Sequence, residues 1–389
     1  TSVIPMEWAG CKINVIDSPG CFDFVGEMEE AVSAADAAII VVSGKAGVEV
    51  GTEKAWDICE KNNMPRMFFV TDMDVDNASY KNVVEQLTEM YGKKIAPLHL
   101  PIRENEKFVG YVNVISEKAQ KWVGKEVVDC EIPDYSKEYL ETYREILMEA
   151  IAETSEDMMD RYFNGETFSE DEMRAALRIS VNNCAIFPIS MGSNVLCQGI
   201  YTLMDDIVKL LPSPLNKEVA GINLKTNEIF AANYDFSKVK SAYIWKTIVD
   251  PFIGKYSLIK VMSGVLKADD VIYNKEKDIE EKISKLYLLQ GNKPIEVKEL
   301  HAGDIGAIAK LTAARTGNTL STKSTPIQYG KYDISVPYTY MRYKPKNKAD
   351  VDKIAQSLQK MSHEDQTLRI VNDSENRQTL LYGMGEQHL

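Results

Sequence analysis

Residues 13–20 read Ile-Asn-Val-Ile-Asp-Ser-Pro-Gly, an apolar strand that ends in an acid and runs into a turn. Proline restricts the backbone and glycine frees it, so the chain can turn sharply here. In proteins with parallel sheets, ligands bind just beyond the carboxyl ends of the strands. Asp17 therefore stands where a metal ion or a phosphate would bind; an aspartate that only initiates a turn is the alternative.

Three further apolar runs show the same behaviour. Residues 37–42 form a short, unbroken apolar run, as in a strand buried on both faces, and residues 66–70 and 185–189 are short, mainly apolar runs of the same kind. They are followed by Ser-Gly-Lys, Thr-Asp-Met-Asp and Ser-Met-Gly-Ser-Asn. Apolar stripes predict amphipathic helices within residues 25–35, 80–91 and 200–210. Alternating strands and helices favour right-handed crossovers and a parallel sheet, whose polar strand ends emerge at one edge and form a binding site.

These strand ends resemble those of the translational GTPase family, and of elongation factor G in particular. Residues 17–20 (Asp-Ser-Pro-Gly) are similar to the family's Asp-Thr-Pro-Gly, where switch II begins. Residues 71–74 (Thr-Asp-Met-Asp) take the place of the guanine-reading Asn-Lys-x-Asp, and residues 192–194 (Gly-Ser-Asn) resemble the Gly-Ser-Ala loop behind the guanine. Residues 383–389 (Gly-Met-Gly-Glu-Gln-His-Leu) are close to a motif of the family's third domain. The matches occur in order along the whole chain, which makes the resemblance specific.

The resemblance implies that the protein binds GTP or GDP together with Mg²⁺. Asp74 would accept hydrogen bonds from the ring N–H and the amino group of guanine, since a carboxylate offers two parallel acceptors. Asp17 would hold Mg²⁺ through water. The nucleotide-binding residues implied by the motifs are Asp17, Gly20, Thr71, Asp72, Asp74, Ser193 and Asn194. Thr71 and Asp72 replace an Asn and a Lys of the family pattern, which weakens guanine specificity; a polar turn is the alternative for these two.

Cys21 occupies the position of the family's catalytic His, which positions the attacking water. A neutral thiol is a poor hydrogen-bond partner for water, so the substitution bears on catalysis. The alternatives for Cys21 are a small apolar filler and a redox-sensitive switch. The resemblance implies a GTPase in the intact protein, whereas the 389-residue chain itself is expected to be inactive.

The sequence contains no Gly-x-x-x-x-Gly-Lys-Ser/Thr, the loop that cradles phosphates. Residues 1–8 predict a strand that pairs with residues 11–16, so we expect the first strand, the phosphate loop and switch I upstream of Thr1. The family's fourth and fifth domains are expected to be absent as well. Without the phosphate loop, the affinity of this chain for GTP is expected to be far below that of an intact factor.

The predicted fold class is α/β. Residues 1–214 are expected to form a truncated P-loop NTPase-type parallel sheet domain, as implied by the resemblance, with a helical insertion at about residues 92–183. The insertion would contain a hairpin at residues 108–116, an acidic helix at 135–163 and a second helix at 170–183. Short β-rich runs at 243–248, 256–262, 271–273 and 283–289 predict a β-barrel domain at residues 215–323.

A third domain is expected to begin at residue 324. A strand at residues 331–343, a helix at 349–361 and strands at 368–371 and 379–382 follow a β-α-β-β order. This order is the first part of a ferredoxin-like α+β fold, so residues 324–389 are expected to contain only its start.

Composition limits the partners. A net charge of −13 argues against a general DNA or RNA binder, which needs a basic surface. The six cysteines contain no Cys-x-x-Cys pair, and no signal peptide or membrane-length apolar run occurs, so a cytoplasmic protein that binds neither membrane nor DNA is expected.

Three functions remain. The resemblance favours a GTP-binding translation factor similar to elongation factor G, a divergent paralogue or ribosome-protection relative that contacts rRNA and ribosomal proteins. A non-hydrolysing ribosome-binding protein of the same fold is the alternative. A dinucleotide-binding oxidoreductase is disfavoured, because no Gly-x-Gly-x-x-Gly follows a strand.

Overall fold

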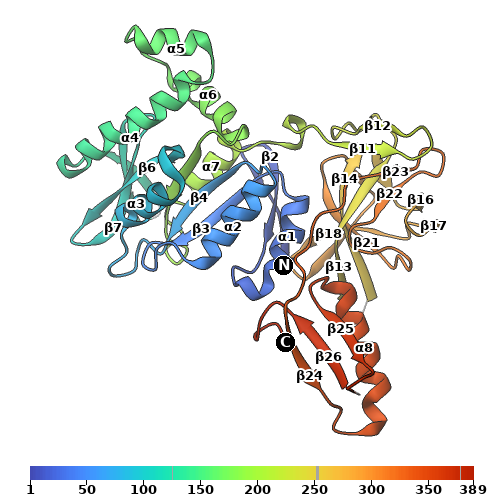
Figure 1. Ribbon diagram of the computed structural model, residues 1–389. Helices are drawn as coiled ribbons and strands as arrows, with labels where there is room; N and C mark the ends of the chain where they lie inside the picture. Colours follow the sequence, from blue (N-terminus) through green and yellow to red (C-terminus); the bar gives the residue numbers. More distant parts are fainter. Residues whose placement is uncertain (125, 251–253, 377) are drawn as a thin grey trace. The chain divides into compact units, whose positions relative to one another are not determined.

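The computed structural model describes residues 1–124, 126–250, 254–376 and 378–389 (Figure 1). They form two compact units. The first unit comprises Thr1–Glu7, Lys12–Asp36 and Ser213–Leu389, and the second comprises Trp8–Cys11 and Ala37–Pro212. Among the described residues, no helix has both the length and the apolar character needed to cross a membrane.

The second unit is built on a sheet of four parallel strands, which confirms the predicted parallel sheet. Their order is β3 (Ala38–Ser43), β4 (Arg66–Thr71), β10 (Phe187–Met191) and β5 (Ile95–Pro97). Helices α2 (Val50–Lys61), α3 (Tyr80–Tyr91) and α7 (Ile200–Leu210) pack against this sheet (Figure 1). Met67, Phe68, Val70 and Ile189 are fully buried, because central strands of such a sheet are covered on both faces. The three-residue strand β5 is not predicted from the sequence.

The short helix η2 (Gly92–Lys94) leads into β5, and an insertion between β5 and β10 begins with an antiparallel four-stranded sheet. Its strands run in sequence order: β6 (His99–Glu104), β7 (Lys107–Asn113), β8 (Lys118–Val123) and β9 (Glu126–Cys130). The prediction of a single hairpin at residues 108–116 was therefore too small. Alternating burial along β7 puts Phe108, Gly110 and Val112 on the covered face.

Three helices complete the insertion: α4 (Asp134–Ala152), α5 (Glu156–Phe163) and α6 (Glu170–Asn182). The prediction of one helix across residues 135–163 was wrong, since the chain breaks between α4 and α5. The Ser155 hydroxyl accepts a hydrogen bond from the Met158 amide (3.2 Å) and so caps a new helix. Ser169 and Glu172 form a reciprocal capping box at the start of α6.

The chain begins with the predicted hairpin of β1 (Ser2–Trp8) and β2 (Cys11–Asp17). Its two-residue turn needs positive φ at both positions, and Ala9 (46°) and Gly10 (75°) adopt it. A short helix η1 (Phe22–Phe24) then leads into α1 (Val25–Ala34) of the first unit.

The middle of the first unit is an antiparallel β-structure. An eight-stranded sheet carries two apolar cores, because neighbouring residues of a strand face opposite sides: Ile244 belongs to one core and Trp245 to the other. The eight strands, in spatial order, are β17 (Ile279–Lys282), β16 (Val271–Asn274), β22 (Thr319–Ser321), β13 (Ser241–Asp250), β14 (Gly254–Ser263), β21 (Ile305–Ala309), β18 (Leu286–Gln290) and β19 (Lys293–Val297). Beside them lie η3 (Pro214–Asn216), a three-stranded sheet of β12 (Glu228–Ala231), β11 (Ala220–Asn223) and β23 (Ile327–Gln328), and a pair of β15 (Val265–Lys267) and β20 (Glu299–His301).

The last segment has the predicted β-α-β-β order, and its helix is preceded by the short η4 (Lys348–Asp350). β24 (Thr339–Tyr343), α8 (Val351–Glu364), β25 (Arg369–Asp373) and β26 (Gln378–Gly383) follow one another, with β26 central in the antiparallel sheet. The predicted strand at residues 331–343 is shorter than expected. Pro337 lacks an N–H, and the Ser335 amide donates to Glu29 (2.8 Å) instead of to a ladder.

Within the first unit, α1 is fixed to the β-structure by two buried lysines. The Lys246 ammonium lies 2.5 Å from Glu27 and 2.7 Å from Glu30. The Lys260 ammonium donates to the carbonyl of Ala34 (2.8 Å) and pairs with Asp36 (2.6 Å). Buried charges persist only when they are paired, so the direction of α1 is closely specified.

Candidate functional site

Three neighbouring strands of the second unit end in one corner, where main-chain hydrogen bonds join the segments beyond them. The amide of Gly44, after β3, donates to the carbonyl of Thr71 at the end of β4 (2.8 Å). The amide of Met73 donates to the carbonyl of Gly192, which follows β10 (3.2 Å). The Gly192 amide donates in turn to the Val70 carbonyl (2.9 Å). This corner is the edge at which the sequence predicts a binding site.

Asp72 is held within the corner by a hydrogen bond to a neighbouring strand end. Its backbone is left-handed (φ 60°), a conformation that Asp tolerates better than most residues. Its carboxylate accepts a hydrogen bond from the Ser43 hydroxyl (2.7 Å), and the Ser43 oxygen accepts from the amides of Lys45 and Ala46 (3.3 Å each). One carboxylate oxygen of Asp72 thus connects the ends of β3 and β4.

Asp74 presents the open acceptor of the corner. Its side chain is half-buried, and its Oδ1 atom is buried without a hydrogen-bond partner among the described residues. A buried carboxylate oxygen without a donor is costly, and a ligand that brings an N–H would complete it. The donor set of a guanine edge fits this requirement. Thr71, at the end of β4, is half-buried beside it.

Ser193 sits in a tight loop between β10 and α7. It is fully buried, its amide donates to the Gln198 carbonyl (2.9 Å), and its hydroxyl accepts from the Leu196 amide (3.0 Å). Asn194, by contrast, is exposed. Ser193 therefore shapes the loop, while Asn194 is free to meet a ligand.

Two glycines let the loop close. A Cβ on Gly192 would lie 2.3 Å from the Gln198 carbonyl oxygen, and one on Gly199 would lie 2.3 Å from the Met191 carbonyl oxygen. Gly199 also has a positive φ of 79° and immediately precedes α7. The close approach of the two chain segments requires glycine at both positions.

The remaining predicted residues belong to the first unit. Asp17 is the exposed last residue of β2, and Gly20 is exposed in the turn that follows. Cys21 is exposed directly before η1, and its thiol lies 3.7 Å from the Gln387 side-chain oxygen. Because Asp17 is in one unit and Asp74 and Ser193 are in the other, their convergence stays a prediction.

Sequence reasoning missed two residues that organise these segments. Ser43 was recognised only as the polar end of a strand, although it is the partner of Asp72. Asp23 is buried, with a side-chain oxygen 2.8 Å from the donating Gln387 amide. No short-range pattern identifies Asp23, because its partner lies more than three hundred residues along the chain.

Comparison with known proteins covers nearly the whole chain. The family described as the elongation factor Tu GTP binding domain matches residues 1–213. Elongation factor G domain 2 matches residues 240–323, and elongation factor G domain III matches residues 334–389. A crystal structure of the protein ttk003000868 from Thermus thermophilus superposes with a TM-score of 0.85 at 29% sequence identity. The superposition covers 100% of this chain and 56% of the Thermus chain, so this chain spans little more than half of that protein.

Proposed function

Because the chain belongs to the translational GTPase family, with an elongation factor Tu GTP binding domain followed by elongation factor G domains 2 and III, we propose that the intact protein is a translation factor similar to elongation factor G. In this proposal it binds guanine nucleotide, acts on the rRNA and proteins of the ribosome in the cytoplasm, and hydrolyses GTP. Its departures from the family pattern at Ser18, Cys21, Thr71 and Asp72 support a divergent paralogue.

The observation that carries the proposal is the buried Oδ1 of Asp74, which has no hydrogen-bond partner in the described part of the chain and lies in the corner that Met73 and Gly192 hold together. In our proposal Asp74 reads the guanine edge, with Thr71 beside it and the Ser193–Asn194 loop behind the base. In this proposal Asp72 supports the corner through its hydrogen bond with Ser43, which uses Oδ2. Only the rest of the Asp72 side chain is then available to contact the base.

For the metal, we propose that Asp17 holds Mg²⁺ through water and that Gly20 brings its backbone near the nucleotide. An exposed carboxylate on a strand end suits this role, since Mg²⁺ keeps much of its hydration shell and uses one or two protein carboxylates together with phosphate oxygens. Bound Mg²⁺ neutralises the charge that develops on the phosphate oxygens during transfer. Asp17 would position this ion, and its backbone turn would face the phosphates.

The base-reading role is tested by Asp74→Asn in the protein at its full natural length. An Asn amide places a donor where the carboxylate accepted, so it rejects the guanine N–H and suits the additional carbonyl of xanthine. We expect GTP affinity to fall at least about a hundredfold and XTP affinity to rise. Asp76→Asn, an exposed neighbour in the same turn, is the matched control and should bind GTP as the native protein does. Unchanged GTP binding by Asp74→Asn would contradict the proposal.

Cys21 separates the proposed GTPase from its alternative, a non-hydrolysing ribosome-binding protein of the same fold. We expect ribosome-stimulated GTP hydrolysis by the full-length native protein, measured as released phosphate. If that turnover is robust, the alternative fails. If it is absent and Cys21→His restores it strongly, the alternative gains, because the imidazole then supplies the missing water-positioning group. Cys11→His, on an exposed cysteine of β2, controls for the added imidazole.

A further inference from the structure

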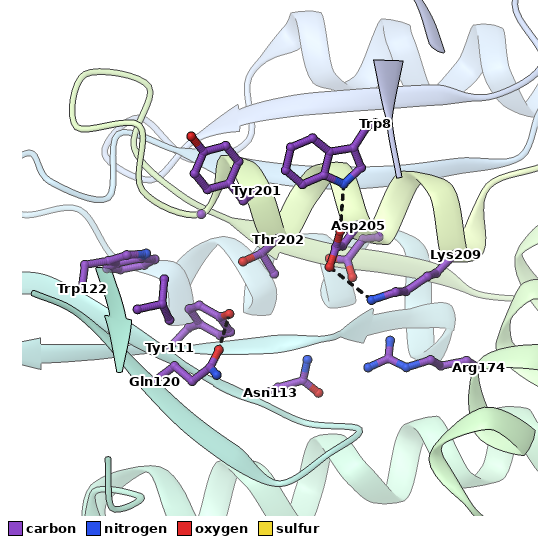
Figure 2. Close-up of a pocket in the computed structure, with 13 residues that line it drawn as sticks. Trp8, Tyr111, Asn113, Gln120, Trp122, Arg174, Tyr201, Thr202, Asp205 and Lys209 are labelled. Carbon is purple, nitrogen blue, oxygen red and sulfur yellow. Dashed lines mark hydrogen bonds and ion pairs between the residues drawn. The ribbon is translucent and has the colours of Figure 1, made fainter. Parts of the chain in front are cut away.

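A separate pocket of about 360 Å³ lies within the second unit, and none of the residues assigned to nucleotide binding line it. It is bordered by strands of the insertion, by α6 and α7, and by Trp8 of the second unit (Figure 2). Pockets that bind small molecules measure roughly 300–1,000 Å³. The volume therefore suits a ligand with a single small ring system better than one with a ring, a sugar and several phosphates.

Aromatic side chains form much of the pocket wall. Trp8 and Tyr201 stack with their ring centroids 5.4 Å apart and their planes within 7°. Tyr111 and Trp122 form a second pair, 5.7 Å apart and tilted by 45°. Figure 2 shows both pairs bordering the same space. Ring faces and edges of this kind favour a planar aromatic ligand, which can stack on one ring and meet another edge to face.

Most polar groups of the lining are already satisfied. The Asp205 carboxylate accepts from the Trp8 indole N–H (2.8 Å) and pairs with the Lys209 ammonium (3.2 Å). The Gln120 side chain accepts from the Tyr111 hydroxyl (2.7 Å), and its amide nitrogen donates elsewhere. These contacts hold the wall in shape and occupy the Asp205 and Gln120 side chains, whereas the Lys209 ammonium keeps further N–H donors.

Two lining groups are different. The Arg174 guanidinium has one ion pair among the described residues, with Glu170 at 3.9 Å, which is too long for a hydrogen bond. The Asp206 side chain is 4% exposed, and its Oδ2 atom has no hydrogen-bond partner among the described residues. The Nδ1 atom of His99 lies 3.7 Å from Oδ2, which is too far for a hydrogen bond. A planar guanidinium matches a carboxylate through two parallel hydrogen bonds. A buried acceptor requires a donor.

We infer that this pocket is a binding site for a small aromatic carboxylic acid whose ring carries an N–H or O–H donor. The ring lies against the Tyr111–Trp122 and Trp8–Tyr201 pairs, the carboxylate binds Arg174, and the ring donor faces Asp206. A singly charged acid suits the local charges better than a phosphate dianion, because the Asp205 carboxylate lines the pocket and the Glu170 carboxylate lies beside Arg174.

The site is independent of the proposed nucleotide corner, since its recognition groups are on α6, α7, the insertion sheet and Trp8. Its test can therefore fail while the proposed function holds, and the reverse is equally possible.

The test uses indole-3-acetate as the probe, in saturation-transfer NMR and calorimetric titrations of the 389-residue chain. Indole supplies the ring without the acid, and acetate supplies the acid without the ring. We expect indole-3-acetate to bind and each of the two partial probes to bind at least about tenfold more weakly, since a tenfold change corresponds to about 1.4 kcal/mol. Equal binding of indole and indole-3-acetate would overturn the role of Arg174, and no binding of any probe at millimolar concentration would overturn the site.

Arg174→Gln tests the anion contact directly. We expect it to weaken indole-3-acetate at least about tenfold and to leave indole unchanged. Arg178→Gln is the matched control: the same substitution one helical turn further along α6, at a residue that does not line the pocket. Circular dichroism and thermal unfolding establish that both variants fold. Equal losses of binding in the two variants would contradict the assignment.

Asp206→Asn tests the donor contact. The Asn amide can still accept a hydrogen bond through its oxygen, so the affinity for indole-3-acetate should fall only a few-fold. Asp206→Leu has no acceptor, and it should abolish the preference for indole-3-acetate over naphthalene-1-acetate, an analogue whose rings carry no N–H. If native protein binds the two acids equally well, Asp206 does not read a ring donor.

Discussion

The carboxylate of Asp23 accepts a hydrogen bond from the Gln387 amide at 2.8 Å, although the two residues lie at opposite ends of the chain. The contact is tight, since a Cβ on Gly385 would lie 2.3 Å from an Asp23 oxygen. His388 adds a second tie, with Nε2 2.7 Å from the Asp365 carboxylate and Nδ1 accepting from the Met384 amide (3.0 Å). The segment around Asp23, after β2, therefore packs directly against residues 383–389 and is hydrogen-bonded to them.

Asp23→Ala should release this segment. A hydrogen bond to a buried charged acceptor contributes about 1.5–3 kcal/mol, so the variant should speed hydrogen exchange of the Gln387 amide at least about tenfold. Exchange measured by mass spectrometry over the last residues of the chain checks this. Asp17→Ala, at an exposed carboxylate of β2, is the control and should leave that exchange unchanged. Identical protection in Asp23→Ala would show that packing at Gly385, and not the carboxylate, holds the segment.

The buried pair His99 and Asp206 should make opposite contributions to pH dependence. Burial lowers the pKa of His99 to about 3, and burial raises the pKa of Asp206 to about 7. The Asn113 side-chain nitrogen donates to Nε2 of His99, because the Asn113 oxygen already accepts from two amides, so the neutral ring carries its proton on Nδ1. Between about pH 4 and 6.5 the folded pair holds one proton on Asp206, and the unfolded pair holds one on His99.

The free energy of unfolding should consequently show little pH dependence from this pair. In Asp206→Asn only His99 remains, the unfolded state binds more protons, and stability should rise with pH from about 3 to 6.5. In His99→Gln only Asp206 remains, the folded state binds more protons, and stability should fall as pH rises from about 4 to 7. Urea unfolding at several pH values measures both slopes, each limited to about 1.4 kcal/mol per pH unit. Slopes of the same sign in the two variants would contradict these protonation states.

Gly199→Ala should cost far more stability than an alanine at another glycine with a left-handed backbone. Gly199 (φ 79°) and Gly165 (φ 72°) both have positive φ, but an added Cβ on Gly165 meets nothing within 4 Å, while on Gly199 it meets the Met191 carbonyl oxygen at 2.3 Å. Gly165→Ala should therefore cost about 1 kcal/mol from backbone strain alone, and Gly199→Ala several kcal/mol. Thermal unfolding compares the two, and equal shifts would mean that the loop relaxes around the methyl group.

Lys246→Met should strongly destabilise the first unit. Burial by itself would raise the pKa of Glu27, but the attraction of the Lys246 ammonium is stronger and holds this pKa at about 2. For Glu30 the effect of burial is stronger than that of the same ammonium, and its pKa is raised to about 7. Removing the cation leaves two carboxyl groups without their partner, which costs about 3–5 kcal/mol for a buried pair. Glu30→Gln alone should cost little near pH 6 and should recover part of the loss when combined with Lys246→Met. A loss below about 1 kcal/mol in the single Lys variant, by chemical denaturation, would contradict this account.

The parallel sheet could be predicted because its signals are local. Continuous apolar runs, each followed by polar residues, identify β3, β4 and β10, and apolar stripes identify α3 and α7. β5 contains only Ile95–Pro97, too few residues for a pattern to appear. The corner followed from strand order, and the family resemblance supplied Asp74 and Ser193 as predicted nucleotide contacts within it. The pairing of Asp72 with Ser43 depends on side-chain geometry that a sequence does not state.

Other features were set by tertiary contacts. The spacing of residues 135–163 in the sequence is typical of one continuous helix, and the cap by Ser155 is what divides it into two. The strand predicted from residue 331 begins at Thr339 because Ser335 bonds to Glu29, a residue of α1. The burial of Asp23 likewise depends on Gln387. The partners of Ser335 and Asp23 are distant in sequence, and a distant partner leaves no periodic signal.

The division between α4 and α5 changes how the acidic side chains of residues 135–163 are arranged. Arg161 of α5 pairs with Glu172 of α6 (2.9 Å) and with Glu166 (3.3 Å), so α5 is attached to α6 and does not continue the axis of α4 (Figure 1). The carboxylate row of α4 therefore ends near Ala152, and the acidic residues of α5 lie along a second, separate axis.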